Sequence, residues 1–551
     1  MNRNAPPTPP SSGPTPRTAT PPPNGVVGGG APTTGAPTRP RVEVELAEDD
    51  LRGNTEAILA GVETASASRP TFFTYGGILA RLVTAPPIPQ GQAVQGLRGG
   101  ALTVQPLTTP PLLLNQLFEL LDIVRAKGRQ LVPAVPDHVL LQNLLATPIA
   151  RWNAPPLSRL VDTPVYTAEG RLLAQDGYDP QSGIWVALAP ELRGLQVPWL
   201  PSRQHVDAAL AVLVDDVWGH FPFRSGADVA NALACALTPL LRMPVDGPTP
   251  LFAVVSSTPG TGKSLLARTL AHPFVGDRLA EYTPIFGTRE EPELRKQLTS
   301  YLSQGVGGIL FDNAKGAVSG GTLEGALTRR HWTDRLLGSN VTGDFPITTL
   351  WLLTANNPEF TFESARRTAP VFLRPTAEDP TRRPDIAADR QGEGWLRAQR
   401  KRAVEALLTL CVWWRSRPPP VYRGAVLGGY ESWSRTVGGV LEACGVPDFL
   451  ANLDDFRAQW ATEDGGWHDF VVAWDAKHGG GWVTAEQLWL SVAVFGDYFD
   501  DVAERGKEPA KSLGRLLHHR MGRIYAGKRI TRSPTRAHGR WSWALVDPRL
   551  P

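Results

Sequence analysis

The chain has few of the residues that hold small secreted domains together, with three cysteines among 551 residues. Cys235, Cys411 and Cys444 lie far apart and form no CxxC pair, which argues against a disulfide framework and a zinc site and favours a reducing compartment. The sequence also lacks any apolar run near the ~18 residues that span a bilayer. Its first residues lack the apolar stretch of a secretory signal. We therefore expect a cytoplasmic protein without a membrane segment.

An excess of either charge is also missing, because the formal net charge is only +3 at pH 7. A function that needs positive charge must therefore depend on a local segment. Proline, in contrast, is abundant, and residues 1–40 contain twelve prolines but no acidic, aromatic, leucine or isoleucine residue. Such a segment buries too little apolar surface to offset its ordering entropy. We interpret it as a disordered, solvated tether, with partner binding as the less favoured alternative.

The chain is too long to fold around one hydrophobic core, so its length predicts two to four domains. Hydrophobic periodicity predicts an alternating strand at 41–46, a strand, glycine turn and strand over 71–83, helical spacing through 110–127, and short strands joined by turns over 148–200. Residues 176–183 could be taken for a metal loop, but two aspartates and a serine here are better explained as turn residues. From about 251 to 374, strands and helices alternate, which predicts a parallel α/β sheet.

One stretch within this region matches a phosphate-binding loop of the form GxxxxGK[ST], read from Ser257 to Ser264 with serine in place of the first glycine. An apolar strand pattern precedes it and a helix pattern follows, which is the context that the motif requires. Glycines let successive backbone N–H groups face phosphates, and the helix dipole adds to the anion site. Lys263 is expected to pair with the β and γ phosphates, and Ser264 to ligate Mg²⁺. The expected ATP-contacting residues are Thr258, Pro259, Gly260, Thr261, Gly262, Lys263, Ser264 and Leu265.

A second apolar strand pattern ends at Asp312. A carboxylate at the end of a neighbouring strand is what a phosphate-loop enzyme needs to hold Mg²⁺ and its water. The next residue is Asn313, whose amide can orient water but cannot take its proton. Either Asn313 only orients water, or another carboxylate acts as the base.

Two further motifs complete an ordered set. An apolar strand pattern ends in Asn356 and Asn357; alone these read as a turn, but as the third motif they make Asn356 a candidate sensor of the γ-phosphate. Arg366 and Arg367 then precede another apolar strand. An exposed pair here fits an arginine finger that reaches a neighbouring subunit's γ-phosphate, although a solvated or salt-bridged surface pair is the plainer alternative.

The end of the chain is locally basic. Between Lys511 and Arg540 there are nine lysines or arginines and no aspartate or glutamate, which suits contact with a polyanion. The order helix, helix, hairpin over 470–546 predicts a winged helix-turn-helix. Its recognition helix and wing would carry the expected DNA contacts, which are Arg515, Arg520, Arg523, Lys528, Arg529 and Arg532. The alternative is a solvated basic face. Lys315, Arg329 and Arg330 are weaker candidates for contact with a translocating DNA strand.

The ordered motifs resemble those of the AAA+ class of ring ATPases. More narrowly, LFDN, LTRRHWTDRLLGS, LWLLTANN and SARR are similar to the primase-helicase ATPases of phages and mobile elements, which are related to superfamily 3 helicases. The resemblance covers roughly 71–546, and an asparagine after the strand-end aspartate fits this group. It implies an ATP- and Mg²⁺-dependent homo-oligomeric ring, with a hexamer favoured. We see no primase domain, so priming would come from a separate chain.

The expected fold class is α/β, with an AAA+ P-loop parallel-sheet core, an N-terminal α+β region, a helical lid and a C-terminal winged helix. The expected segments are the tail 1–40, an α+β domain 41–147, a β-rich connection 148–200, the ATPase domain 201–390, the lid 391–460 and the winged helix 465–551. The expected function is a DNA helicase or translocase in mobile-element or phage replication. A DNA-binding initiator or loader without processive unwinding, and a remodeller of proteins, are the alternatives.

Overall fold

The computed structural model describes residues 41–67, 69–85, 100–287, 289–374, 393–417, 422–460, 462–492, 509–536 and 539–549. The predicted proline-rich tail lies outside these ranges. Among the described residues, no helix is long and apolar enough to cross a membrane.

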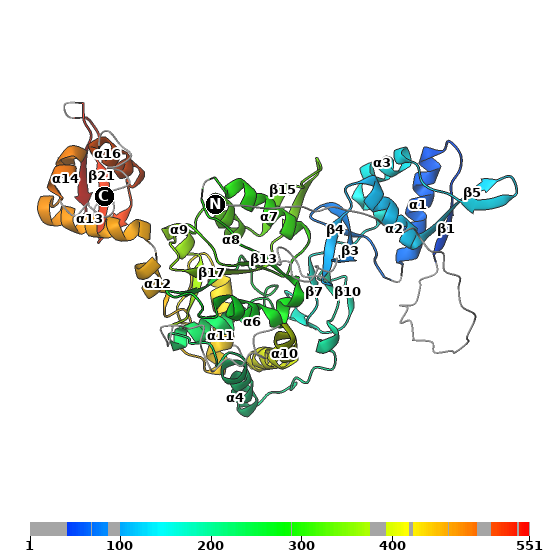
Figure 1. The fold of residues 1–551 in the computed structure, drawn as a ribbon, viewed down its shortest axis with the longest axis horizontal. Helices are drawn as coiled ribbons and strands as arrows, with labels where there is room; N and C mark the ends of the chain where they lie inside the picture. The colour runs from blue at the N-terminus through cyan, green and yellow to red at the C-terminus, as the bar shows by residue number, and fades with distance from the viewer. Residues whose placement is uncertain are drawn as a thin grey trace, which may run out of the picture. The chain divides into compact units, whose positions relative to one another are not determined.

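The largest sheet among the described residues has five strands, several of which are labelled in Figure 1. Its strands, in spatial order, are β13 (Leu279–Tyr282), β14 (Gly308–Phe311), β17 (Leu350–Asn356), β12 (Leu251–Ser256) and β18 (Thr368–Phe372). Every neighbouring pair is parallel, which confirms the predicted parallel α/β sheet. The strand before the phosphate loop, β12, is separated from the Asp312 strand, β14, by β17. Parallel strands bring their carboxyl ends to one edge, so the motifs after these three strands share that edge.

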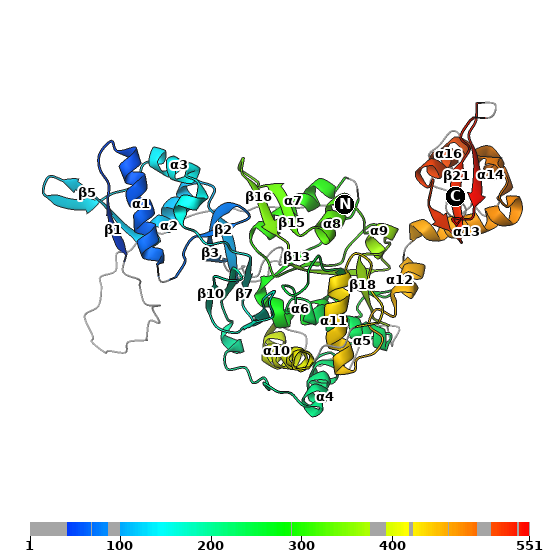
Figure 2. The same ribbon diagram turned by 180° about the vertical axis from the view of Figure 1, so that it is seen from behind.

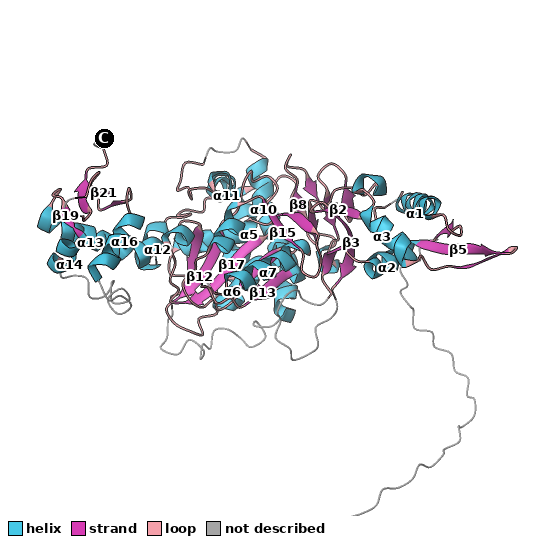
Figure 3. Ribbon diagram, turned by 90° about the horizontal axis from the view of Figure 1, so that it is seen from above, coloured by secondary structure: helices cyan, strands magenta, loops and turns pink. Residues whose placement is uncertain are grey.

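Both faces of this sheet are buried, as continuous apolar runs require. Phe252 and Val254 of β12 pack on one side, in a core with α5 (Gly226–Leu237) and α6 (Lys263–Val275). Leu251, Ala253 and Val255 pack on the other side, with α7 (Glu291–Ser303) and α8 (Gly321–Thr328). Figure 3 shows helices flanking the sheet. The alternation follows from the two-residue side-chain period of a strand.

Further helices extend the first of these two cores. They are α4 (Arg203–Ala211), which continues as a π-helical turn (Val212–Val217), α10 (Glu393–Arg415) and α11 (Glu431–Cys444). Leu213, Leu407 and Trp433 are buried in the same cluster as Phe252. These helices therefore pack against the sheet layer.

A β-hairpin is inserted between β14 and β17. Its strands are β15 (His331–Arg335) and β16 (Thr342–Pro346), which pair antiparallel. The sequence did not predict it, because exposed and buried residues alternate over only five residues in each strand. The sheet layer is completed by a 3-10 turn (Gly276–Arg278) after α6 and the short helix α9 (Phe362–Ala365) before β18.

The N-terminal region is α+β, as predicted, with one correction. The elements are β1 (Val42–Glu45), α1 (Leu51–Ser66), β2 (Phe73–Tyr75), β3 (Ile78–Thr84), β4 (Leu102–Pro106), α2 (Pro110–Leu120), β5 (Leu121–Lys127), β6 (Gln130–Pro133) and α3 (His138–Ala146). Helical spacing through 110–127 was wrong beyond Leu120. Leu121 and Ile123 alternate with exposed residues, and pairing with β1 fixes the segment as a strand.

Residues 148–200 form short strands and turns, as predicted. They comprise two 3-10 turns (Ile149–Trp152 and Pro190–Leu192), β7 (Arg159–Val161), β8 (Val165–Tyr166), β9 (Leu172–Leu173), β10 (Gly177–Asp179) and β11 (Ile184–Val186). The carboxylate of Asp179 accepts a 3.0 Å hydrogen bond from the backbone N–H of Ser182 and pairs with Arg171 at 2.8 Å. Asp179 therefore serves the turn, and among the described residues no group of three His, Cys, Asp or Glu could hold a metal.

The C-terminal region has its own hydrophobic core, and Figure 2 shows its helices and strands. Helix α12 (Leu453–Trp460) precedes this region and packs in the two central cores through Leu453 and Phe456. The elements of the C-terminal region are α13 (Thr462–His478), β19 (Val483–Thr484), α14 (Ala485–Ser491), α16 (Pro509–His519), β20 (Ile524–Tyr525), β21 (Lys528–Arg532) and β22 (Ser542–Val546). The strands form an antiparallel sheet in the order β19-β22-β21-β20. Trp474, Leu513 and Trp543 are buried between these helices and the sheet.

Candidate active site

The loop between β12 and α6 has the backbone form that a phosphate-binding loop needs. Gly260 and Gly262 have φ of 74° and 88°, a left-handed region that costs a side-chain-bearing residue energy and glycine little. Helix α6 begins at Lys263, directly after Gly262. The predicted ATP-contacting residues, from Thr258 to Leu265, thus lie in one curled loop and the first turn of the helix, whose N–H groups form a site for an anion.

Lys263 lies folded against this loop. Its ammonium donates to the carbonyl of Thr258 at 3.0 Å and contacts the Thr261 hydroxyl at 3.1 Å. Burial lowers the pKa of Lys263 to about 8, while the nearby Asp312 carboxylate acts in the opposite direction. The ammonium therefore sits where more negative charge would stabilise its charged form.

Three oxygen-bearing side chains meet beside the loop. The hydroxyl of Ser264 donates to Oδ1 of Asp312 at 2.5 Å, and the hydroxyl of Thr354 donates to the same oxygen at 2.7 Å. Thr354 lies on β17 and also accepts a 2.8 Å hydrogen bond from the backbone N–H of Asn313. The structure thus brings together the two predicted magnesium ligands. Thr354 was missed, because a threonine inside an apolar strand gives no signal in the sequence.

A partly buried ion pair adjoins Asp312. Arg268, on α6, binds Glu281 of β13 through two nitrogens, with a shortest distance of 2.7 Å, and lies 3.6 Å from Oδ2 of Asp312. The Glu281 side chain is only 7% exposed and that of Arg268 is 30% exposed, so the pair is partly shielded from water and less screened than a surface pair. The sequence indicates neither residue, because the pair joins two different elements, a helix and a strand. One strand-end carboxylate is therefore flanked by a hydroxyl on one side and a guanidinium on the other.

Three asparagines at or just after the ends of β14 and β17 differ in backbone conformation and contacts. Asn313 follows Asp312 with φ of 53°, and Asn357 has φ of 43°, a region in which asparagine is enriched among residues other than glycine. Asn356 is exposed at the end of β17, in register with Ser256. Asn357 makes the contact with the loop, since its amide donates to the carbonyl of Ser257 at 3.2 Å. The structure therefore places both Asn356 and Asn357 beside the loop, and Asn357 was not predicted as a loop contact.

Arg366 and Arg367 lie at the opposite edge of the sheet. They precede β18, which runs parallel to β12 with Thr368 opposite Leu251, and the backbone N–H of Leu251 donates to the carbonyl of Arg367 at 3.0 Å. Leu251 and Ser256 are five residues apart, or roughly 16 Å along a strand. Neither arginine is therefore placed to reach the phosphate loop of its own chain.

Both arginines pair with Glu363 at 2.7 Å. Burial raises the pKa of the Glu363 carboxyl, but hydrogen bonds from the two guanidinium groups outweigh it and hold that pKa below its usual value. The side chain of Arg366 is 40% exposed and that of Arg367 is 11% exposed. Arg366 is thus the more accessible of the pair.

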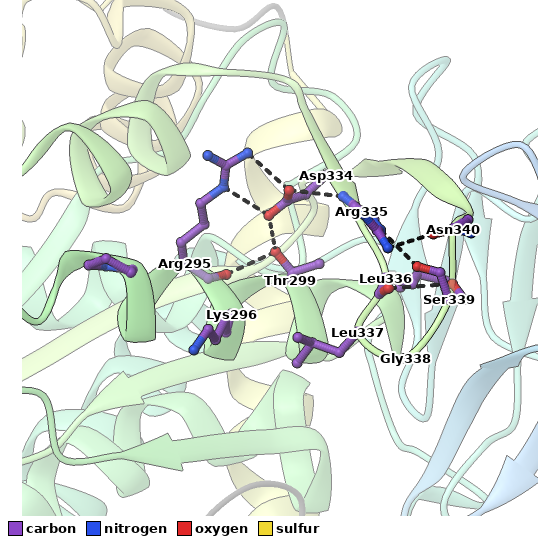
Figure 4. A pocket seen from close by; sticks show the side chains of 11 residues that line it. Arg295, Lys296, Thr299, Asp334, Arg335, Leu336, Leu337, Gly338, Ser339 and Asn340 are labelled. Carbon is purple, nitrogen blue, oxygen red and sulfur yellow. Dashed lines mark hydrogen bonds and ion pairs between the residues drawn. The ribbon is translucent and has the colours of Figure 1, made fainter.

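The β15–β16 hairpin is anchored to α7 (Figure 4). Arg295 binds both carboxylate oxygens of Asp334 at 2.9 and 3.0 Å, and the Thr299 hydroxyl donates to Asp334 at 2.6 Å. Near the turn, Arg335 donates to the carbonyl of Ser339 at 2.8 Å.

The three weaker candidates for contact with a DNA strand are dispersed. Arg330 pairs with Asp246 at 2.5 Å. Lys315 instead forms a parallel bridge with Ile285, and Arg329 ends α8. These three basic residues form no single cluster in the described contacts.

The six predicted DNA contacts fall into two sets. Arg515 and Arg532 line a cleft between α14, α16 and the β21–β22 hairpin. Arg520 instead lies over the Trp467 ring and Lys528 pairs with Asp475 of α13 at 3.2 Å. Arg523 and Arg529 flank the β20–β21 turn, with Arg529 opposite Ile524. The basic segment is therefore not one continuous face.

Comparisons with known proteins add little beyond this geometry. No protein-family model and no curated protein matches the chain. Among solved structures, the JCV helicase is 14% identical, over 46% of this chain and 73% of that chain, with a TM-score of 0.21. The C-terminal region of NrS-1 is 11% identical over 76% and 93% of the two chains, with a TM-score of 0.33. The SCCmec type IV Cch active helicase is 11% identical over 87% and 97%, with a TM-score of 0.29. At such values these matches assign neither a family nor an activity, and the function must be argued from the site.

Proposed function

We propose that the protein is an ATP- and Mg²⁺-dependent ring ATPase of the AAA+, superfamily 3-like type, which translocates on DNA and unwinds it during replication of a phage or mobile element. The observation that carries the proposal is the meeting of the phosphate loop, the Ser264 hydroxyl and the Asp312 carboxylate at one edge of a parallel sheet, with Ser264 and Asp312 in contact at 2.5 Å. Ligands of open α/β sheets bind at the carboxyl edge of the strands.

The residues present fit a nucleotide and a magnesium ion. Lys263 is largely buried with a lowered pKa, and a triphosphate would supply the negative charge that favours its charged form. Ser264 and Asp312 offer oxygen ligands, which Mg²⁺ prefers. When bound, Mg²⁺ would neutralise charge on the β and γ phosphates.

The chain's own residues have separate roles in this proposal. The loop N–H groups and Lys263 bind and orient the phosphates, while Thr354 holds Asp312 in position through its 2.7 Å hydrogen bond. Asn313 and Asn356 lie at the same edge and are proposed to orient the attacking water. Positioned polar groups of this kind lower the barrier because they need no rearrangement during the reaction.

The arginine pair supports a ring. Because Arg366 and Arg367 lie a strand's length from their own loop, they are proposed to act as fingers on the γ-phosphate of a neighbouring subunit, in a homo-oligomer for which six subunits are favoured. A finger supplied by another subunit is an established way to stabilise transition-state charge. The contacts with Glu363 hold the pair in place until assembly.

The other segments receive roles consistent with this activity. We propose that 391–460 acts as the lid of the ATPase domain 201–390, and that 465–551 is a winged-helix DNA-binding domain. We propose that residues 41–147 form a small α+β domain and residues 148–200 a β-rich connecting region. A separate primase is the proposed replication partner.

Strand displacement on a forked duplex tests this function. Purified, assembled protein with ATP and Mg²⁺ should release the labelled strand, and Lys263→Ala protein should not. Hydrolysis stimulated by DNA without strand release or movement past a roadblock would favour the initiator or loader instead. DNA binding that does not weaken steeply as salt rises would favour a protein remodeller, because phosphate contacts release counterions.

A further inference from the structure

The C-terminal region contains a cleft with an unusual lining. It encloses about 930 Å³ between α14, α16 and the β21–β22 hairpin, elements that lie together in Figure 2. Three tryptophans contribute to its wall, namely Trp489, Trp541 and Trp543. Trp543 is 2% exposed and belongs to the hydrophobic core, whereas Trp489 and Trp541 are half-buried. Two indole rings are therefore partly available at the cleft surface.

The same cleft is strongly basic. Lys511, Arg515, Arg532, Arg536 and Arg540 line it, and the acidic side chain in its wall, Glu486, pairs with Arg540. Five positive charges against one negative charge create a local field that the near-neutral whole chain does not have. A polyanion is the ligand that such a field favours.

The aromatic and basic groups are interleaved. The guanidinium of Arg532 lies 4.0 Å from the centre of the Trp541 ring, and that of Arg536 lies 5.0 Å from it. Both distances are within the range of cation–π attraction. Both guanidinium groups lie over the ring, so they fix the orientation of Trp541, and a base that stacks there takes the place of one of them.

We propose that this cleft binds single-stranded DNA, with a base stacked on Trp541 and the neighbouring phosphates paired with Arg515 and Arg536. The inference deepens the DNA contact of the proposed function and rests on it. Stacking platforms beside positive charge are the usual means of holding single strands, since every base has a flat face. The volume also suits a small number of nucleotides, because pockets of roughly 300–1,000 Å³ hold small-molecule ligands.

The shape of the cleft argues against a duplex as its ligand. Reading the major groove requires a recognition helix that projects into it, whereas Arg515 of α16 lines a hollow. Arg520 and Lys528, two further predicted DNA contacts, point to other partners, Trp467 and Asp475. Separated strands are also what the proposed unwinding would produce.

The test measures binding to the full-length protein without nucleotide, by fluorescence anisotropy. Two labelled 12-mers are compared: oligodeoxythymidine and an abasic strand with the same phosphates but no bases. Trp541→Ala should weaken thymidine binding by about tenfold and leave abasic binding within about twofold, since stacking needs a base. Trp541→Phe should retain most of the affinity. The proposal would be overturned if Trp541→Ala weakened the binding of both strands equally or weakened neither.

Two further variants separate charge from folding. Arg536→Ala should weaken the binding of both strands to the same extent. It should also reduce the slope of log affinity against log salt concentration by about one. Arg549→Ala removes an exposed arginine outside the cleft, paired with Asp547 at 3.0 Å, and should change neither affinity. An acidic peptide or a duplex that binds as tightly as oligodeoxythymidine, with the same dependence on Trp541, would contradict a single-strand site. Tenfold tighter binding of an oligouridine strand would contradict DNA as the ligand.

Cross-linking locates the bound base directly. A thymidine strand with one 5-iododeoxyuridine should cross-link to the peptide that contains Trp541 or Trp489, in wild-type and in Lys263→Ala protein alike. Cross-links confined to 251–374 would overturn the assignment. The binding and cross-linking experiments do not use ATP, so their outcomes can be interpreted even if the ATPase proposal fails.

Discussion

The Ser264 hydroxyl donates a 2.5 Å hydrogen bond to Oδ1 of Asp312, so the two predicted magnesium ligands touch although 48 residues separate them in the chain. Ser264 lies in the first turn of α6, and Asp312 follows β14. The strand between β12 and β14 contributes Thr354, which binds the same oxygen at 2.7 Å. The arrangement is therefore assembled by sheet order rather than by proximity in sequence.

Lys263→Ala is expected to abolish ATP hydrolysis, because it removes the charge that pairs with the phosphates. Folding and basal DNA binding should remain, since the basic segment lies in the C-terminal region. The measurement is phosphate release together with DNA affinity. Lys296→Ala is the matched control, because Lys296 is half-exposed and pairs with Glu293 at 3.2 Å, and it should hydrolyse ATP at the wild-type rate. Comparable loss in both variants would contradict the role of Lys263.

Thr354→Val keeps the side-chain shape but removes the hydroxyl that holds Asp312 and accepts from the N–H of Asn313. Leaving buried polar groups unpaired should lower the free energy of unfolding by about 1–3 kcal/mol. It should also raise the Mg²⁺ concentration for half-maximal hydrolysis several-fold. Thermal unfolding and a Mg²⁺ titration measure the two effects.

The control for Thr354→Val is Thr409→Val, whose buried hydroxyl bonds only to the carbonyl of Glu405 within α10. It should leave the Mg²⁺ requirement unchanged. An unchanged Mg²⁺ requirement in Thr354→Val would show that Thr354 does not position Asp312.

Glu281→Gln tests the ion pair beside Asp312. With the Glu281 charge removed, Arg268 keeps its positive charge 3.6 Å from Asp312 and repels a cation bound there. The Mg²⁺ concentration for half-maximal hydrolysis should rise about three- to tenfold, which corresponds to about 1 kcal/mol. Glu293→Gln, at an exposed ion pair with Lys296, should not change it. A lowered Mg²⁺ requirement in Glu281→Gln would contradict this electrostatic account.

Arg366→Ala and Arg367→Ala are each expected to lose hydrolysis as pure oligomers. Mixed with Lys263→Ala subunits, the arginine-deficient subunits should regain part of the wild-type rate, because an intact finger from a neighbour then meets an intact phosphate loop. Phosphate release across mixing ratios measures this. If no ratio restores activity, the arginines belong to the salt-bridged pair with Glu363 and not to a finger.

Much of the sheet could be predicted from the sequence, since strands buried on both faces appear as continuous apolar runs and the glycines of the loop mark its turns. Local patterns failed where a contact between distant segments decided the outcome. Leu121 and Ile123 became a strand through pairing with β1. Arg268 and Glu281 gave no signal, because a helix and a strand bring them together. The C-terminal cleft was missed because its aromatic and basic residues come from α14, α16 and the hairpin.

The most direct measurement is the rate of phosphate release from Mg²⁺-ATP by the purified, assembled protein, with and without single-stranded DNA. The proposed site predicts hydrolysis that requires Mg²⁺, rises with DNA and disappears in Lys263→Ala. Protein that stays inert toward ATP under all of these conditions, with DNA present, would contradict the central claim that this sheet edge is an ATPase site.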